Sequence, residues 1–287
     1  MTLQHRILSL FSLFALAALL AILPVTPALT APPPVTPRAK ALMQTARIRI
    51  EKELPKKGLQ LGAPIFIRIF KIPGDLEVWL ARDGRFQLFK NYPICSYSGY
   101  PGPKLMEGDW QSPEGFYTVS ARQMNPNSSY HLAFNVGYPN DFDRARNRTG
   151  SAIMVHGGCS SRGCFAMGNS QMEEIYLLAH AALAAGQQEF ALHIFPFRLT
   201  ARNLFKFRSS PWIDFWKKLQ PGYDFFEQFH KTPLVSVVQG NYLIQDPLSR
   251  HAMTTKEIQS DAPGTSMTGL SHNLNMALVS NNKQGQQ

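Results

Sequence analysis

The sequence has 287 residues, with 29 Lys or Arg against 19 Asp or Glu, and a formal charge of +10 at pH 7. A hydrophobic content of 44% is enough to bury a core and excludes a wholly disordered chain. The 20 Gly and 21 Pro residues follow no triplet repeat, which excludes collagen, and three cysteines are too few for a disulfide-built mini-fold or a four-cysteine zinc module.

The first 31 residues read as an export segment. Residues 7–23 are all apolar or serine, Arg6 precedes them, and a stretch rich in Pro, Thr and Ala follows. This order is typical of a secretory signal, and an uncleaved anchor is the alternative because 17 residues is the lower limit of a membrane span. Either way, we expect the body in the periplasm or cell envelope, with membrane contact only through this segment if it stays uncleaved.

The excess of basic residues favours an anionic partner. Lys and Arg form no long runs, and no repeat alternates them with aromatic residues as nucleic-acid platforms do. Export argues further against nucleic acid. The charge therefore favours the cell wall or envelope as the partner.

The pattern of the body predicts a fold that is mainly β with α (α+β). Residues 32–58 are expected to form a Pro-rich spacer and an amphipathic helix over Arg38–Leu54. Alternating apolar residues then predict the following strands, with Asp83-Gly84 as a hairpin turn: Ile65–Phe70, Leu76–Leu80, Phe86–Phe89, Gly115–Ala121, His131–Val136 and Ala152–His156.

The second half of the chain predicts more helix. Ser170 and Glu173 form a capping-box pair before a helix over Gln171–Ala185, and a strand is expected over Phe190–Phe195. Two short aromatic helices, Trp212–Leu219 and Tyr223–Phe229, are expected on either side of Pro221-Gly222. We expect a main domain over residues 59–200, a helical extension over 201–245 and a disordered tail over 246–287, which lacks aromatic residues.

The segment from Ile153 to Met167 contains the candidate catalytic or metal-binding residues. An apolar strand runs into His156, a glycine-rich turn follows, and Cys159 and Cys164 lie just before a helix. Three interpretations remain open: a catalytic pair of His156 and Cys164; a metal site of His156, Cys159 and Cys164, completed by His131 or His193; and a Cys159–Cys164 disulfide. With Cys95 as the third cysteine, three pairings exist, and a Cys95–Cys159 bond would leave Cys164 free.

At this point the sequence resembles the YkuD-type L,D-transpeptidases, and more closely their YafK-like murein branch. The resemblance covers residues 59–242 and rests on several stretches in a fixed order: Phe66–Lys71, Tyr92–Cys95, Gly102–Leu105, Gly108–Tyr117, Phe134–Arg144, His156-Gly157, Ser161–Cys164 and His193–Arg198. It implies a β-rich catalytic domain over residues 59–200 with a cysteine nucleophile, a role in cell wall biogenesis and cell shape, and peptidoglycan stem peptides as substrates.

The resemblance also assigns roles by position. Cys164 is expected as the nucleophile and His156 as the general base, while Ser161 and Gly163 belong to the family motif. The acyl-enzyme would form at the carbonyl of diaminopimelate, with loss of the terminal D-alanine, and an amine would resolve it. We expect the amides of Gly163 and Cys164 to bind the oxyanion and the Gly157 carbonyl to orient the imidazole. No metal or other cofactor is implied.

Five residues are expected to bind substrate, and Ser161 of the family motif is one of them. Arg162 stands where the broader family usually has histidine, and its guanidinium can pair with a substrate carboxylate. Tyr138, Asn140 and Arg144 lie in a polar loop that can line the cleft. Two alternatives to transpeptidation remain: a hydrolase of the same acyl-enzyme type that cuts links between a lipoprotein and the wall, and a non-catalytic wall-binding module. His193, on an apolar strand, is interpreted as structural.

Overall fold

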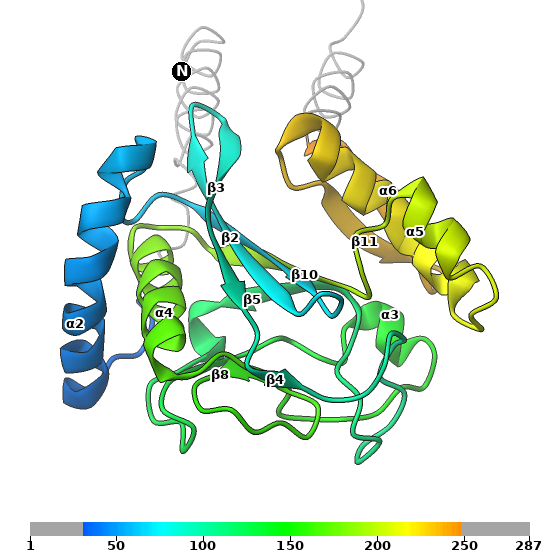
Figure 1. Ribbon diagram of the computed structural model, residues 1–287, viewed down its shortest axis with the longest axis horizontal. Coiled ribbons are helices and arrows are strands. Elements are labelled where there is room, and N and C mark those ends of the chain that lie inside the picture. The colour runs from blue at the N-terminus through cyan, green and yellow to red at the C-terminus, as the bar shows by residue number, and fades with distance from the viewer. Residues whose placement is uncertain (1–30, 248–287) are drawn as a thin grey trace, which may run out of the picture. The chain divides into compact units, whose positions relative to one another are not determined.

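The computed structural model describes residues 31–247, so the expected export segment and nearly all of the expected tail lie outside it. No helix within residues 31–247 is long and apolar enough to cross a membrane. The expected α+β fold is confirmed (Figure 1). The helices are α2 (Pro37–Glu53), α3 (Asp141–Arg144), α4 (Asn169–Ala184), α5 (Ala201–Lys206) and α6 (Ile213–Phe229), with 3-10 turns at Pro55–Lys57 and Ala121–Gln123.

The larger sheet has the strand order β3-β2-β1-β10-β5. Its strands are β1 (Ile65–Phe70), β2 (Asp75–Arg82), β3 (Arg85–Pro93), β5 (Gly115–Ser120) and β10 (Glu189–Phe195). The central strand β1 runs parallel to β10 and is buried on both faces, because its isoleucines join the main core while Phe66 and Phe70 face aromatic clusters on the other side. Among these residues, Arg68 is buried with its Nε 2.9 Å from Glu77 Oε2.

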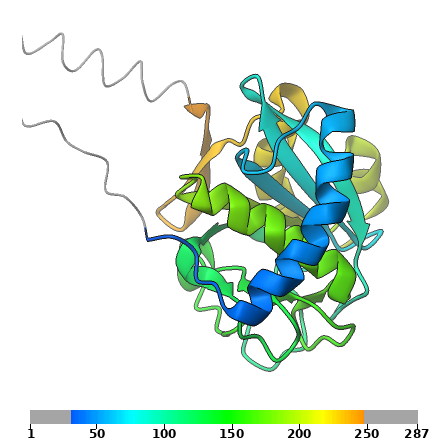
Figure 2. The same ribbon diagram turned by 90° about the vertical axis from the view of Figure 1, so that its left-hand side faces the viewer.

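Helices α4 and α2 cover the isoleucine face of this sheet, and α2 crosses over α4 (Figure 2). The expected amphipathic helix is confirmed, with Met43, Ala46 and Ile50 buried. The expected capping box of α4 is wrong, because Gly168 occupies the cap position and the helix begins before Ser170. Glu173 instead accepts a hydrogen bond from Arg49, which joins the two helices.

The aromatic face of the sheet is covered by α6 and by a hairpin of β11 (Leu234–Val238) and β12 (Asn241–Gln245). Two short helices were expected here, but α6 runs continuously through Pro221. Its buried residues Trp216, Tyr223 and Phe226 keep helical spacing across the Pro-Gly pair, and their packing offsets the one backbone hydrogen bond that proline removes. The hairpin is a second difference, because residues 201–245 were expected to be helical.

A second sheet, of order β4-β9-β8-β7-β6, carries the candidate site. Its strands are short: β4 (Ser96–Tyr97), β6 (Met124–Asn125), β7 (Ala133–Asn135), β8 (Met154–His156) and β9 (Phe165–Ala166). Strands β8 and β9 are parallel, with Val155 opposite Phe165 and His156 opposite Ala166. The two-residue strands could not be predicted from the sequence because two residues show no hydrophobic period.

Candidate active site

The parallel pair β8 and β9 brings His156 and Cys164 to one face of the second sheet. Val155 and Phe165 lie opposite each other and are fully buried in the main core. His156 follows Val155 and Cys164 precedes Phe165, so by alternation both side chains point away from that core. The intervening glycine-rich loop returns the chain to the adjacent strand, which places Cys164 level with Met154, two residues before His156.

His156 is buried and its tautomer follows from one contact. The distance from Nδ1 to the carbonyl oxygen of Gly157 is 2.5 Å. Since a carbonyl can only accept, Nδ1 carries the proton and Nε2 keeps its lone pair. Burial lowers the imidazole pKa, and the hydrogen bond to Gly157 opposes this in part. Neutral His156 is thus a base prepared to take a proton at Nε2.

The Cys164 thiol is half-buried and free of any disulfide. The Met154 amide donates to Sγ across 3.4 Å, and Sγ lies 3.7 Å from the Ala152 carbonyl oxygen. Burial raises the thiol pKa, while the Met154 amide and the Lys104 ammonium act in the opposite direction. Both groups are therefore neutral at neutral pH, and no hydrogen bond within residues 31–247 joins the thiol to the His156 ring.

Three serines hold the turn that carries Cys164. Ser161 and Ser112 donate to the Cys164 carbonyl oxygen, across 2.8 and 3.3 Å. Ser98 lies 2.9 Å from Ser161 Oγ, and its own amide donates to Ser112 Oγ across 3.1 Å. These contacts join three separate segments of the chain at the backbone of one residue, Cys164.

The same serines change the expected role of Gly163. Its amide donates to the hydroxyl oxygens of Ser98 and Ser161, 3.1 Å from each. The expectation that this amide binds an oxyanion needs correction, because the amide is already committed to the serines. The Cys164 amide has no such serine partner within residues 31–247. Gly163 also has a φ of +124°, which a residue with a side chain rarely adopts.

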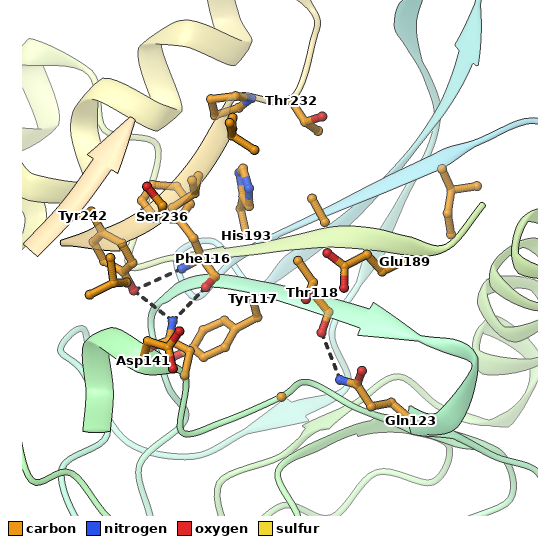
Figure 3. Close-up of a pocket in the computed structure, with 18 of the residues that line it drawn as sticks. Phe116, Tyr117, Thr118, Gln123, Asp141, Glu189, His193, Thr232, Ser236 and Tyr242 are labelled. Atoms are coloured by element: carbon orange, nitrogen blue, oxygen red, sulfur yellow. Dashed lines mark hydrogen bonds between the residues drawn. The ribbon is translucent and has the colours of Figure 1, made fainter. Parts of the chain in front are cut away.

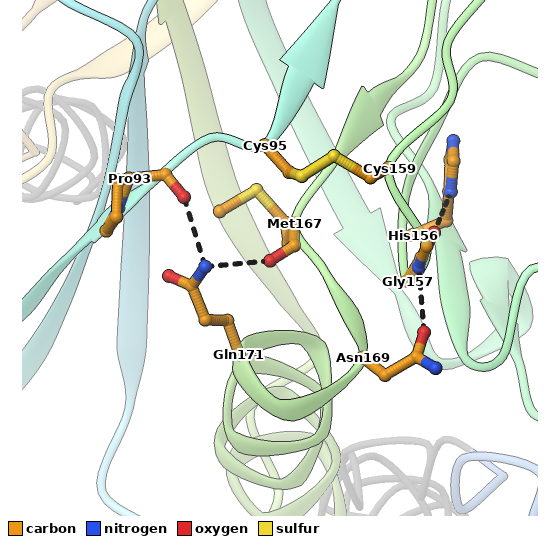
Figure 4. Close-up of a disulfide and its surroundings, with 9 residues drawn as sticks. Pro93, Cys95, His156, Gly157, Cys159, Met167, Asn169 and Gln171 are labelled. Atoms are coloured by element: carbon orange, nitrogen blue, oxygen red, sulfur yellow. Dashed lines mark hydrogen bonds between the residues drawn. A yellow bond between two sulfur atoms is a disulfide. The ribbon is translucent and has the colours of Figure 1, made fainter.

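A disulfide joins Cys95 to Cys159 beside this turn (Figure 4). It connects the chain after β3 with the glycine-rich loop between β8 and β9, and their Cα atoms are 5.3 Å apart. This pairing contradicts both the Cys159–Cys164 disulfide and the metal site that would use Cys159. Within residues 31–247, no three His, Cys, Asp or Glu side chains are placed to hold a metal ion.

Arg162 is exposed next to this turn. Its guanidinium carbon lies 5.2 Å from the centre of the Trp110 ring, and the Trp110 side chain is 58% exposed. Trp110 follows Asp109, whose carboxylate accepts hydrogen bonds from Lys104 and from the Leu105, Met106 and Gln111 amides. No role was expected for this tryptophan from the sequence.

Within residues 31–247 no hydrogen bond joins the polar loop of residues 138–144 to Cys164, and the expected role of Tyr138, Asn140 and Arg144 in binding substrate stays a prediction. Tyr138 is buried, with its hydroxyl 3.2 Å from the carbonyl oxygens of Lys104 and Thr149. Asn140 caps α3 and donates from Nδ2 to the Phe116 carbonyl oxygen across 2.8 Å. Arg144 is exposed and pairs with Asp141. These residues serve the fold.

Asn140 and Arg144 instead line a separate cavity of about 660 Å³ between β5, β10 and β11 (Figure 3). His193 reaches this cavity from β10, with Phe66 and Phe116 at ring distances of 4.7 Å. Burial lowers the His193 pKa to about 3, and its Nδ1 has no hydrogen-bond partner in the described part of the chain. His131 does not line this cavity, and its Nε2 lies 2.9 Å from Oε1 of Glu173.

Comparison with known proteins supports a single family. The model of the YkuD family, the L,D-transpeptidase catalytic domain, matches residues 75–182. The chain is 43% identical over 201 residues to "Putative L,D-transpeptidase YafK" of Escherichia coli (strain K12), covering 70% of this chain and 81% of the relative.

Two solved structures are similar at a much lower level. The helical cell shape determining protein Pgp2 from Campylobacter jejuni aligns at 22% identity and a TM-score of 0.38, over 64% of this chain and 66% of that one. Bdellovibrio bacteriovorus Bd1075 aligns at 23% identity and a TM-score of 0.33, over 56% and 60%.

Proposed function

The chain belongs to the YkuD L,D-transpeptidase family, and from this premise we propose that it is an exported cysteine acyltransferase acting on peptidoglycan stem peptides. One observation supports this most strongly: the free thiol of Cys164 is held beside the strand that carries His156, whose Nε2 keeps its lone pair. A nucleophile and a base on neighbouring strands are the minimum that acyl transfer through a thioester requires.

In the first half-reaction, the Cys164 thiol turns from the Ala152 carbonyl toward His156 and passes its proton to Nε2. Sulfur attacks the carbonyl carbon of diaminopimelate, forming a carbon–sulfur bond and an oxyanion. The bond to the D-alanine nitrogen then breaks, and His156 returns the proton to the departing amine. The products are a thioester on Cys164 and free D-alanine.

In the second half-reaction, an acceptor amine attacks the thioester. Nε2 takes a proton from the amine, the carbon–sulfur bond breaks, and the proton returns to sulfur, which regenerates the thiol. Water in place of the amine gives hydrolysis with the same balance. The Gly157 carbonyl supports both steps, because it accepts from Nδ1 and stabilises the imidazolium that forms at His156.

The oxyanion needs a backbone N–H donor that is not already bonded to another acceptor. Gly163 donates to two serines, so we assign this role to the Cys164 amide. The serines act by holding the Cys164 carbonyl, which fixes the orientation of the peptide unit that follows the nucleophile. The proposal also includes export to the periplasm. It includes a second substrate, a lipoprotein linked to the wall.

Product mass tests the proposal. The full chain and its Cys164→Ala variant are incubated with purified tetrapeptide muropeptides and with lipoprotein-linked muropeptides. We expect cross-linked dimers from the unmodified protein and none from the variant. Loss of the protein adduct without dimers would identify a hydrolase. Product formation by Cys164→Ala, or no change with either substrate, would overturn the mechanism and favour a wall-binding module.

A further inference from the structure

Arg162 has a backbone that is fixed on both sides. The preceding residue, Ser161, is bonded to Ser98 and to the Cys164 carbonyl, and the amide of the following residue, Gly163, donates to the same two serines. Arg162 lies two positions before the nucleophile within this braced turn. Its side chain therefore leaves the backbone at a point that is fixed relative to the Cys164 thiol.

The guanidinium of Arg162 is also held in place but is not neutralised. It stacks on Trp110 at 5.2 Å, and no carboxylate within residues 31–247 forms an ion pair with it. The neighbouring acid, Asp109, is already occupied by the Lys104 ammonium, 2.5 Å away, and by three backbone amides. A stacked guanidinium keeps its N–H edge free, and that edge matches a carboxylate with two parallel hydrogen bonds.

We propose that Arg162 and Trp110 form a subsite for the substrate carboxylate on the residue that leaves. This inference rests on the proposed function, in which the departing D-alanine carries a free carboxylate one carbon from the nitrogen of the broken bond. It is the carboxylate nearest to that bond. Arg162 binds it, and Trp110 positions Arg162. The subsite selects donor peptides that end directly after the scissile bond over peptides whose next residue lacks a free carboxylate.

Matched substrates test this subsite. The first is a tetrapeptide muropeptide with a free terminal carboxylate, called the free acid. The second is the same muropeptide with its terminal carboxylate converted to a carboxamide. The third keeps the free terminal carboxylate and is amidated only on the diaminopimelate side chain. Affinity is measured by calorimetry on Cys164→Ala, alone and combined with Arg162→Gln, Arg162→Lys or Trp110→Ala, so that no turnover is needed. Arg208→Gln is the matched control, because Arg208 stacks on exposed Phe205 at 4.3 Å in the same way but outside the site.

We expect Arg162→Gln to weaken binding of the free acid by roughly tenfold to a hundredfold, the range of a charged hydrogen-bonded pair. It should leave the terminal carboxamide unchanged. Arg162→Lys and Trp110→Ala should give smaller losses on the free acid, and Arg208→Gln none. Three results would overturn the subsite. Cys164→Ala could bind the free acid and the terminal carboxamide with equal affinity, or Arg162→Gln could weaken the binding of both equally. The third is a loss of affinity that follows amidation of the diaminopimelate side chain.

Turnover by the full chain separates this result from the proposed function. If the unmodified chain forms Cys164-dependent products while Arg162→Gln raises KM for neither the free acid nor the terminal carboxamide, the subsite is wrong and the acyltransferase stands. If no products form but the free acid still binds through Arg162, the acyltransferase is wrong and the subsite stands.

Discussion

The hydroxyl of Ser161 donates to the carbonyl oxygen of Cys164 across 2.8 Å, so a side chain of the turn holds the backbone of the proposed nucleophile. Ser112 reaches the same oxygen from a segment 52 residues away. The Cys164 backbone is thus fixed by hydroxyl groups just before β9 begins, and the position of the thiol depends on the side chains of Ser161 and Ser112.

Ser112→Ala tests this dependence. Ser112 is fully buried, so its loss leaves the Ser98 amide without its partner and should lower the free energy of unfolding by about 1–3 kcal/mol. We expect kcat to fall about tenfold with little change in KM, because the nucleophile is displaced while substrate contacts remain. Ser210→Ala, which removes a hydroxyl bonded to the Trp212 amide, is the control. An unchanged kcat in Ser112→Ala would contradict the positioning role.

Alkylation should find one free thiol. In the folded, non-reduced chain, iodoacetamide should add one label, at Cys164, because the other two cysteines are paired. Reduction in denaturant should add two more labels, and Cys164→Ala should take none before reduction. Intact-mass spectrometry measures the count. Two or three labels without reductant would show that the Cys95–Cys159 bond does not form.

The pH profile should reflect a neutral pair. Neutral His156 is the proposed base, and its pKa is lowered from 6.5, so kcat/KM should fall only as the pH drops below that value. The Cys164 pKa is raised from 9.0, so alkylation of His156→Ala should keep increasing beyond pH 9. Stopped-flow rates across pH 4–10 measure both. A thiolate that is already formed at neutral pH in His156→Ala would contradict this assignment.

Removing the disulfide should destabilise the fold. The bond closes a chain segment with a sequence separation of 64, and such bonds contribute about 2–4 kcal/mol. We expect the double variant Cys95→Ser with Cys159→Ser to lose stability in this range in urea unfolding. Chemical reduction of the unmodified chain is the matched comparison. The same midpoint in all three samples would show that the bond adds nothing to stability.

His193 should make the fold sensitive to acid. Its pKa is about 3 in the folded chain against 6.5 for a histidine in the unfolded chain, so the unfolded chain binds one more proton between these values. This contribution is fully present above pH 6.5 and is lost as the pH falls toward 3, at up to about 1.4 kcal/mol per pH unit. In His193→Leu the slope of unfolding free energy against pH should be shallower by that amount. Equal slopes would contradict burial of a neutral imidazole.

Much of the fold follows from local pattern. The strands of the larger sheet and helices α2 and α4 have strong hydrophobic periods, so their positions could be predicted from the sequence. Helix α6 could not, because its continuity through Pro221 depends on the sheet it covers. The Cβ of any residue larger than glycine at 222 would lie 2.6 Å from Phe116, a contact between segments far apart in the chain.

The residues of the candidate site also divide into those that could be predicted from the sequence and those that could not. His156 and Cys164 could be found because a strand, a glycine-rich turn and a helix lie within one short segment. Ser98 and Ser112 could not, because serines are ordinary loop residues and their contacts with the turn come from 65 and 52 residues away. The sequence does not show which role a polar residue such as Asn140 has, since capping a helix and bonding a strand require the same amide that a substrate would.

The outer edge of β5 has a further consequence. This strand ends the larger sheet, yet the carbonyls of Phe116 and Thr118 already accept hydrogen bonds from the side-chain amides of Asn140 and Gln123, across 2.8 and 2.9 Å (Figure 3). A strand from another molecule would find these acceptors occupied. Two amide side chains thus block this edge against pairing with a strand of another molecule, which protects the larger sheet from polymerisation through β5.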